Sequence, residues 1–338
     1  MYSLLKDSRF QIFGAALVVV AMTAGNALAQ AKFKWDMAHS YPATSLSGES
    51  DQEFARLVKE KSGGAIEITI HFGGSLGIQD RDHWTSVEDG VVPLANTPTD
   101  KFIGFDPAFS AQSMPFLTPG LKQAKAMIDV ARPYYERALG KAKQTLLYTT
   151  PWTPVGIWSK KPVRDLATLK TLKIRTNNPN STKTFQAAGA TPIPLGFPEV
   201  IPALTTGTID AVLTSDEGGI SAKFWEYLTF FNQLNYEVGV NMVHVNKKVF
   251  DGLPADLQKA VRDAAAESEK LAWERGQNRV ERNAEILKQR GVTVVADVPP
   301  AFLAQLADAG KFLIDDWRKS MGPDADKILA DYHKKVGN

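Results

Sequence analysis

Short apolar strand patterns alternate with helical patterns along most of the chain, and this order constrains the fold more than any other feature of the sequence. The strand "TLKIRT" precedes a helix near Ser181, "ATPIPL" precedes "PEVIPALTTG", and "TIDAVLTS" precedes a helix near Ser221. Nearer the start, "FKWDMAH" and "AIEITIHF" flank a helical pattern from Ser47 to Lys61. This alternation predicts an α/β protein with mixed, mainly parallel sheets.

One helical pattern is unusually long. From Pro254 to Arg290 the only glycine is Gly276, and no second proline occurs. A helix of that length spans roughly 50 Å, enough to cross two lobes. The chain has 338 residues, more than a usual single domain, so we expect two α/β lobes joined by several crossings, including the strand "NYEVGVNMVHVN" at 235–246.

Charge and cysteine content exclude several classes of protein. The chain has 39 basic and 37 acidic residues, so no strong field favours nucleic acid or acidic lipid as a partner. It has no cysteine, which excludes disulfides, thiolate catalysis and a lipid-anchored cysteine.

The N-terminus has the pattern of a secretory signal. Lys6 and Arg9 precede the apolar run "FGAALVVVAMTAG" and then "ALA" at 27–29. The run is shorter than the roughly 20 apolar residues that a transmembrane helix needs. We expect residues 1–29 to be a cleaved signal peptide and the mature protein to be periplasmic and not itself embedded in the membrane.

Patterns for catalysis and metal binding are weak. Gly73-x-Ser75-x-Gly77 follows a strand, as in a hydrolase nucleophile elbow, but only after the second strand of the mature chain. A Gly-rich turn is the simpler interpretation; an exported hydrolase or isomerase using Ser75 or a cleft carboxylate remains the alternative. The histidines lack metal-ligand spacing and no dinucleotide or Walker motif occurs, so we expect no metal and no cofactor.

Arg175 is the strongest candidate for ligand binding. It lies at the carboxyl end of the strand "TLKIRT", the end that faces the ligand crevice in open α/β sheets. Asn180 or Ser181 is a candidate cap for the next helix, whose first N–H groups would face the same edge. A guanidinium can hold a carboxylate with two parallel hydrogen bonds, so this edge predicts a carboxylate site.

Five stretches together carry a family resemblance over essentially the whole mature chain. They are "HSYPATSLSGESDQEFARLVKEKSGGAIEITIHFGGSLG", "MPFL", "LATLKTLKIRTNN", "AAGATPIPLGFPEVIPALTTGTIDAVLTS" and "VNKKVFDGLPADLQKAVRDAA". With these stretches the chain resembles the DctP-type solute-binding proteins of tripartite ATP-independent periplasmic (TRAP) transporters.

The resemblance implies a periplasmic-binding-protein-like fold: two α/β domains with hinge strands and a long domain-spanning helix. Domain I is expected at 30–151 with about 240–278, and domain II at 152–239 with about 279–338. The lobes would close on an organic acid and present it to a TRAP membrane permease. A chemoreceptor on the same fold would differ only in the partner that docks.

The expected ligand-binding residues follow from the family pattern and from loop position. Arg175 matches the family's arginine, Phe197 its cleft aromatic, and Thr214 or Ser215 its polar cleft position. With these go the remaining candidates for packing or hydrogen bonding, which are Trp152, Thr153, Asn177, His39, Gln79 and Thr97.

Two departures from the family pattern bear on the ligand. "PWTPVGIWSKKP" has Pro154 near the position of a second arginine in many members, and Thr214 replaces the asparagine of sialic-acid binders. Both argue against sialic acid and a doubly anchored dicarboxylate. A single cationic anchor near Trp152 and Trp158 favours a monocarboxylate with an apolar or aromatic body.

Overall fold

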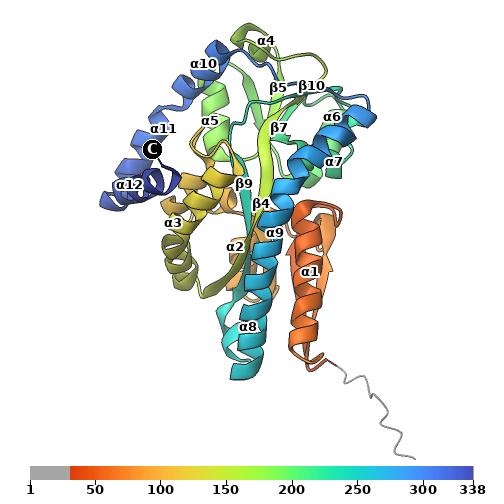
Figure 1. Ribbon diagram of the computed structural model, residues 1–338, viewed down its shortest axis with the longest axis vertical. Coiled ribbons are helices and arrows are strands. Elements are labelled where there is room, and N and C mark those ends of the chain that lie inside the picture. The colour runs from red at the N-terminus through yellow and green to blue at the C-terminus, as the bar shows by residue number, and fades with distance from the viewer. Residues whose placement is uncertain (1–30, 338) are drawn as a thin grey trace, which may run out of the picture.

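Ten strands form one continuous mixed sheet in the computed structural model, which describes residues 31–337 (Figure 1). The expected signal peptide at 1–29 lies outside the described residues. The main strand order is β2-β1-β3-β9-β4-β7-β5-β6, with β8 paired to β4 and β10 paired to β8. The strands are β1 (Phe33–His39), β2 (Ile66–His71), β3 (Leu94–Pro98), β4 (Gln144–Ser159), β5 (Lys173–Thr176), β6 (Thr191–Pro194), β7 (Ala211–Ser215), β8 (Phe230–Asn232), β9 (Val238–Asn246) and β10 (Thr293–Val295).

Helices connect most of these strands. The α-helices are α1 (Leu46–Lys61), α2 (His83–Glu88), α3 (Leu121–Lys141), α4 (Leu166–Lys170), α5 (Pro179–Ala187), α6 (Val200–Thr205), α7 (Asp216–Ser221), α8 (Lys247–Asp251), α9 (Ala255–Gln289), α10 (Pro300–Gly310), α11 (Phe312–Met321) and α12 (Pro323–Val336). Short 3-10 helices lie in the connections and include η1 (Phe72–Gly74), η3 (Thr99–Phe102), η4 (Pro107–Ser113) and η5 (Phe197–Glu199).

Parallel pairing predominates, as the alternation of strands and helices predicts. The parallel pairs are β1 with β2 and β3, β5 with β6 and β7, and β10 with β8. Every antiparallel pair in 31–337 involves β4 or β9. Strand β4 pairs with β9 along its first part and with β7 and β8 over residues 155–159, so it joins the two halves of the sheet.

Local sequence explains where the helix after β5 begins. Asn178 is the N-cap of α5: its side chain accepts from the N–H of Ser181, and the Ser181 hydroxyl accepts from the N–H of Asn178. Pro179 occupies the first turn, where its missing N–H costs nothing. The expectation that Asn180 or Ser181 is the cap is therefore wrong by two or three residues, because the reciprocal pair needs Ser181 inside the helix.

The long helix α9 confirms the prediction of a domain-spanning helix. Its 35 residues run beside α1 in the lower half of Figure 1 and reach α7 and β10 in the upper half. Its first half packs Val261, Ala264 and Ala265 into a core with β1 and α1, whereas Leu287 packs into a core with α6. Helix α10 packs on α5, and α12 packs on α3.

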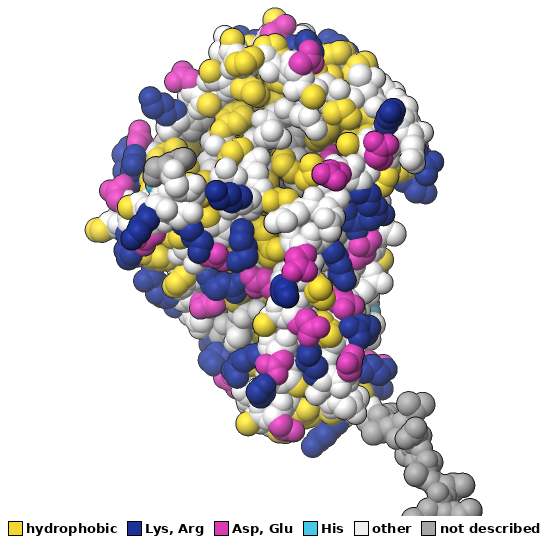
Figure 2. Space-filling view, viewed as in Figure 1, with side chains coloured by type: hydrophobic (Ala, Val, Ile, Leu, Met, Phe, Trp, Pro, Cys, Tyr) yellow, Lys and Arg dark blue, Asp and Glu magenta, His cyan; other side chains and the backbone are white. Residues whose placement is uncertain are grey.

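On the face shown in Figure 2, basic and acidic side chains are interspersed over α9 and the lower half, so no large patch of one charge sign forms there. This distribution agrees with the small formal net charge of +2. Within residues 31–337 no helix combines the length and the apolar character that a membrane span requires.

Candidate functional site

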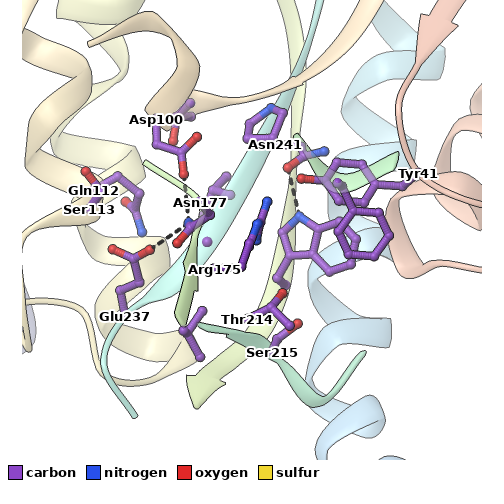
Figure 3. A pocket seen from close by; sticks show the side chains of 17 residues that line it. Tyr41, Asp100, Gln112, Ser113, Arg175, Asn177, Thr214, Ser215, Glu237 and Asn241 are labelled. Carbon is purple, nitrogen blue, oxygen red and sulfur yellow. Dashed lines mark hydrogen bonds between the residues drawn. The ribbon is translucent and has the colours of Figure 1, made fainter. Parts of the chain in front are cut away.

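A buried cavity lies where strand ends from the two halves of the sheet face each other (Figure 3). From one half come Tyr41, just after β1, and Asp100, just after β3. From the other half come Arg175 on β5 and Phe197 just after β6. These are the carboxyl ends of parallel strands, where α/β sheets bind ligands.

Arg175 is held in the cavity wall by backbone carbonyls. Its Nε and Nη2 donate to the carbonyl of Leu195 at 3.0 and 2.8 Å, and Nη1 donates to the carbonyl of Leu213 at 3.4 Å. A guanidinium has five N–H donors, so one donor remains on each Nη atom. These two donors can hold both oxygens of one carboxylate.

The Arg175 charge is buried without a carboxylate partner. The residue is 2 % exposed, and no acidic group of residues 31–337 lies within 4.0 Å of its nitrogens. Burial lowers the pKa of Arg175 below its usual value. Leaving such a charge unpaired costs several kcal/mol, so the wall is built to receive an anion.

Three aromatic rings form one side of the cavity. The ring of Tyr41 lies between those of Trp152 and Phe197, with centroid distances of 4.7 and 4.6 Å. The Trp152 indole is oriented by its Nε1, which donates to Oδ1 of Asn241 at 2.8 Å. The rings come from both halves of the sheet, so they offer an apolar surface to any solute bound between them.

Two carboxyl groups line the opposite side, shown at the left of Figure 3. Asn177 Nδ2 donates to Asp100 Oδ2 at 3.0 Å and to Glu237 Oε1 at 3.3 Å. Asn178 Nδ2 donates to the same two oxygens, at 3.1 and 3.2 Å. Desolvation raises the pKa of Asp100, and it raises the pKa of Glu237 well above its usual range. This side of the cavity therefore carries less negative charge than two ionised carboxylates would.

The cavity is small. The centre of a water-sized sphere can move through about 40 Å³ of it. A single water needs roughly 10 to 15 Å³ by this measure. The space therefore suits a compact solute and excludes a polymer chain.

Six of the ten predicted site residues line this cavity. They are Arg175, Phe197, Trp152, Asn177, Thr214 and Ser215. Their convergence follows from the carboxyl-end argument, because each except Trp152 lies at or just after the end of β5, β6 or β7. Whether they contact a ligand stays a prediction.

The other four predicted residues lie outside the lining. Thr153 donates to Asp216, His39 contacts Tyr41 and lies 3.4 Å from Asp51, and Thr97 is hydrogen-bonded to His83 and His244. Gln79 lies near Gly196, next to Phe197 in the chain. The first three are held in polar networks, so they support the walls instead of facing the cavity.

Seven further polar residues of the lining were not predicted. They are Tyr41, Thr99, Asp100, Gln112, Ser113, Glu237 and Asn241. Tyr41 follows the end of β1 and Asp100 follows the end of β3, so strand-end position was a usable signal for both. Gln112 lies in the 3-10 helix η4 and Glu237 lies just before β9, and no side-chain periodicity in the sequence distinguishes either residue.

Two other candidates lie elsewhere. Ser75 is exposed at the end of η1, and the chain continues into a turn, not into a helix as a nucleophile elbow requires. Trp158 is fully buried against Phe224 and Phe231, and its Nε1 donates to the carbonyl of Ser215. Trp158 therefore belongs to the core and not to the cavity lining. Within the described range no cluster of three potential metal ligands occurs.

A two-lobed α/β fold that encloses a small cavity with a fixed guanidinium defines a solute-binding receptor. The chain belongs to the family of bacterial extracellular solute-binding proteins, family 7, whose model matches residues 37–320. This confirms the resemblance to DctP-type TRAP receptors, a family of binding proteins and not of enzymes.

A named relative and two solved structures agree with this assignment. The chain is 31% identical to the 2,3-diketo-L-gulonate-binding periplasmic protein of Escherichia coli over 73% of this chain and 76% of that protein. It resembles DctP7, a Bordetella pertussis extracytoplasmic solute receptor binding pyroglutamic acid, with a TM-score of 0.85, 30% identity and coverage of 89% and 99%. A marine metagenome TRAP receptor specific for pyroglutamate matches equally well, with a TM-score of 0.85, 30% identity and coverage of 90% and 99%.

Proposed function

We propose that this protein is a periplasmic receptor that binds a small organic acid in the cavity and delivers it to a TRAP membrane permease. The observation that carries the proposal is Arg175, a buried guanidinium with two spare donors and no carboxylate partner among residues 31–337. A ligand carboxylate would satisfy both donors and offset the cost of burying the charge. The signal pattern at residues 1–29 supports export to the periplasm.

The remaining lining fits this ligand class. Trp152, Tyr41 and Phe197 would pack on the ligand body, and Thr214, Ser215 and Asn177 offer hydrogen-bonding groups. The size of the cavity favours a compact acid, and pyroglutamate, which two relatives with 30% identity bind, is the first candidate. Dicarboxylates are disfavoured because the lining has one guanidinium only.

Delivery to a permease rests on closure of two lobes around the ligand. We infer the lobes as residues 30–151 with about 240–278 and residues 152–239 with about 279–338, with α9 and β4 crossing between them. Helix α10 packs on α5 of the second lobe, whereas α11 and α12 pack on η4 and α3 of the first lobe, so the C-terminal segment contacts both lobes. The closed form would be the one that the permease recognises.

The test is thermal unfolding of the signal-free protein with a panel of acids, including pyroglutamate, 2,3-diketo-L-gulonate, keto acids and dicarboxylates. A ligand at 100 times its Kd adds about 2.7 kcal/mol to the free energy of unfolding. We expect a large shift with one class of small monocarboxylate, recovered unchanged by mass spectrometry. Shifts with neutral solutes only would contradict the proposal, and consumption of the acid would favour an enzyme.

A transport assay tests delivery separately. Proteoliposomes that contain the permease subunits of the same genome should accumulate the labelled acid only when the receptor is added. Uptake that is the same without the receptor would show that the protein is not the delivery partner.

A further inference from the structure

Three buried oxygen atoms on one side of the cavity have no hydrogen-bond partner in residues 31–337. They are Asp100 Oδ1, Gln112 Oε1 and Glu237 Oε2. All three residues line the same cavity as Arg175, and the side chains lie together at the left of Figure 3. Gln112 and Glu237 are each 1 % exposed, and Asp100 is 8 % exposed. Buried polar atoms in native proteins are nearly always satisfied, so three orphans on one wall indicate a missing partner.

The hydrogen bonds around these residues fix which of their atoms are free. Gln112 Nε2 donates to the carbonyl of Val238 at 2.9 Å, so its oxygen is left as an acceptor. The Asn177 and Asn178 amides use Asp100 Oδ2 and Glu237 Oε1, so the second oxygen of each carboxyl is free. Arg175 therefore offers hydrogen-bond donors to a ligand, whereas this wall offers mainly acceptors.

We propose that the acceptor wall formed by Asp100, Gln112 and Glu237 binds an N–H group of the ligand, so that the ligand is a small carboxylic acid carrying an amide or ammonium nitrogen. The inference rests on the proposed function and adds a ligand class to it. The carboxylate would lie on Arg175 and the nitrogen would face the acceptor wall. An acid with only carbon in its body would leave the three oxygens unpaired, and a second carboxylate would meet acceptors instead of donors.

The pKa of Glu237 supports an amide over a cation. Burial raises that pKa well above the usual range, and desolvation also raises the pKa of Asp100, so the wall holds less negative charge than two exposed carboxylates would. Glu237 Oε2, Asp100 Oδ1 and Gln112 Oε1 still offer acceptors to a neutral amide N–H. An ammonium group would gain less from a wall with this charge.

The experiment compares pairs of five-membered ring acids that differ at one ring atom. 5-Oxopyrrolidine-2-carboxylate is paired with 5-oxotetrahydrofuran-2-carboxylate, and proline is paired with tetrahydrofuran-2-carboxylate, in calorimetric titrations. In each pair an ether or ester oxygen replaces the N–H, so size and carboxylate are kept. We expect the amide acid to bind at least 20-fold more tightly than its oxygen partner and more tightly than proline. If proline binds more tightly than 5-oxopyrrolidine-2-carboxylate, the ligand nitrogen is an ammonium group, which is the other form of the proposed class.

A variant tests whether the acceptor wall causes the preference for N–H acids. In Glu237→Gln the side-chain oxygen still accepts from Asn177 and Asn178, so an NH₂ group takes the place of Oε2 and faces the ligand nitrogen. We expect at least a tenfold loss of affinity for the N–H acids and a change of less than threefold for the oxygen acids. Glu226→Gln, at an exposed glutamate of the same half, is the matched control. A merely structural defect would weaken both kinds of acid equally.

The outcomes separate this inference from the proposed function. If the oxygen acids bind within threefold of their N–H partners, or if only acids without N–H bind, the inference is overturned while the carboxylate receptor stands. If the N–H acids bind no more tightly than analogues in which a neutral carboxamide replaces the carboxylate, Arg175 does not recognise a carboxylate and the proposed function fails. Binding of no acid at all contradicts both.

Discussion

The Nζ atom of Lys101 donates a 2.7 Å hydrogen bond to the backbone carbonyl of Asn177 and lies 3.7 Å from Oδ2 of Asp80. Lys101 follows β3 in one half of the sheet, and Asn177 follows β5 in the other. The contact therefore spans the cavity edge, because Asn177 also lines the cavity. A bond of this kind exists only while the two halves lie close together.

Removing this bond should speed ligand release. Lys101→Met keeps the aliphatic chain but loses the donor, and a hydrogen bond to a charged group contributes about 1.5 to 3 kcal/mol. We expect roughly a tenfold or larger increase in the dissociation rate, with a small change in the association rate. Stopped-flow tryptophan fluorescence measures both rates. Lys122→Met, at an exposed lysine on α3, is the control; equal rates in both variants would show that Lys101 does not hold the closed form.

Asp51 should make stability depend on pH. Its carboxylate is buried, accepts from Tyr148 and Asn96, and has a pKa raised by desolvation to about 7. In the unfolded chain the pKa is about 3.9. Between these values the native state binds more protons than the unfolded state, so the contribution of Asp51 to stability falls as the pH rises.

Asp51→Asn removes this ionisation and keeps an acceptor for Tyr148 and Asn96. From pH 5 to pH 8 the variant should gain about 1 to 3 kcal/mol of unfolding free energy relative to the wild type. Urea unfolding at the two pH values measures the difference. Asp89→Asn, at an exposed aspartate, should show no such change. A pH-independent difference for Asp51→Asn would show that Asp51 is ionised at pH 5.

Gly219 allows the core tryptophan Trp158 to approach the backbone of α7. A Cβ at Gly219 would lie 2.2 Å from the Trp158 ring, which is fully buried and cannot move aside. We expect Gly219→Ala to cost about 2 to 4 kcal/mol or to prevent folding. Gly140→Ala, in α3 with open space around it, should be neutral or stabilising by up to about 1 kcal/mol. Thermal unfolding that gives both variants the same midpoint would contradict the packing argument.

The fold was largely predictable from local pattern. The strand at 33–39, the strand–helix units around β5, β6 and β7, and the long helix α9 follow from side-chain periodicity and capping signals that act within a few residues. Strand β4 was not predicted, because prolines at 151 and 154 interrupt its 16 residues and its pairing partners are distant in sequence. One of its two register shifts lies between Pro151 and Pro154, and the other lies between Leu146 and Tyr148.

The site was only half predictable for the same reason. Arg175 and Phe197 lie at strand ends that a parallel sheet brings together, so a sequence argument reaches them. The acceptor wall is different, because Gln112 and Glu237 are joined only by tertiary packing of η4 against the start of β9. His39 and Thr97 also lie at strand ends, but their side chains turn into buried networks with Asp51 and with His83, a direction that strand position does not determine.

The most direct test of the central claim is a calorimetric titration of the wild type and of Arg175→Met with the bound acid and with its neutral carboxamide. Methionine fills the space of Arg175 without a charge, and replacing an unpaired buried charge should not lower the stability of the free protein. If Arg175 holds the carboxylate, the wild type prefers the acid over the carboxamide by about 2 to 5 kcal/mol, and the variant loses that preference. An Arg175→Met protein that is folded and binds the acid as tightly as the wild type would contradict the account.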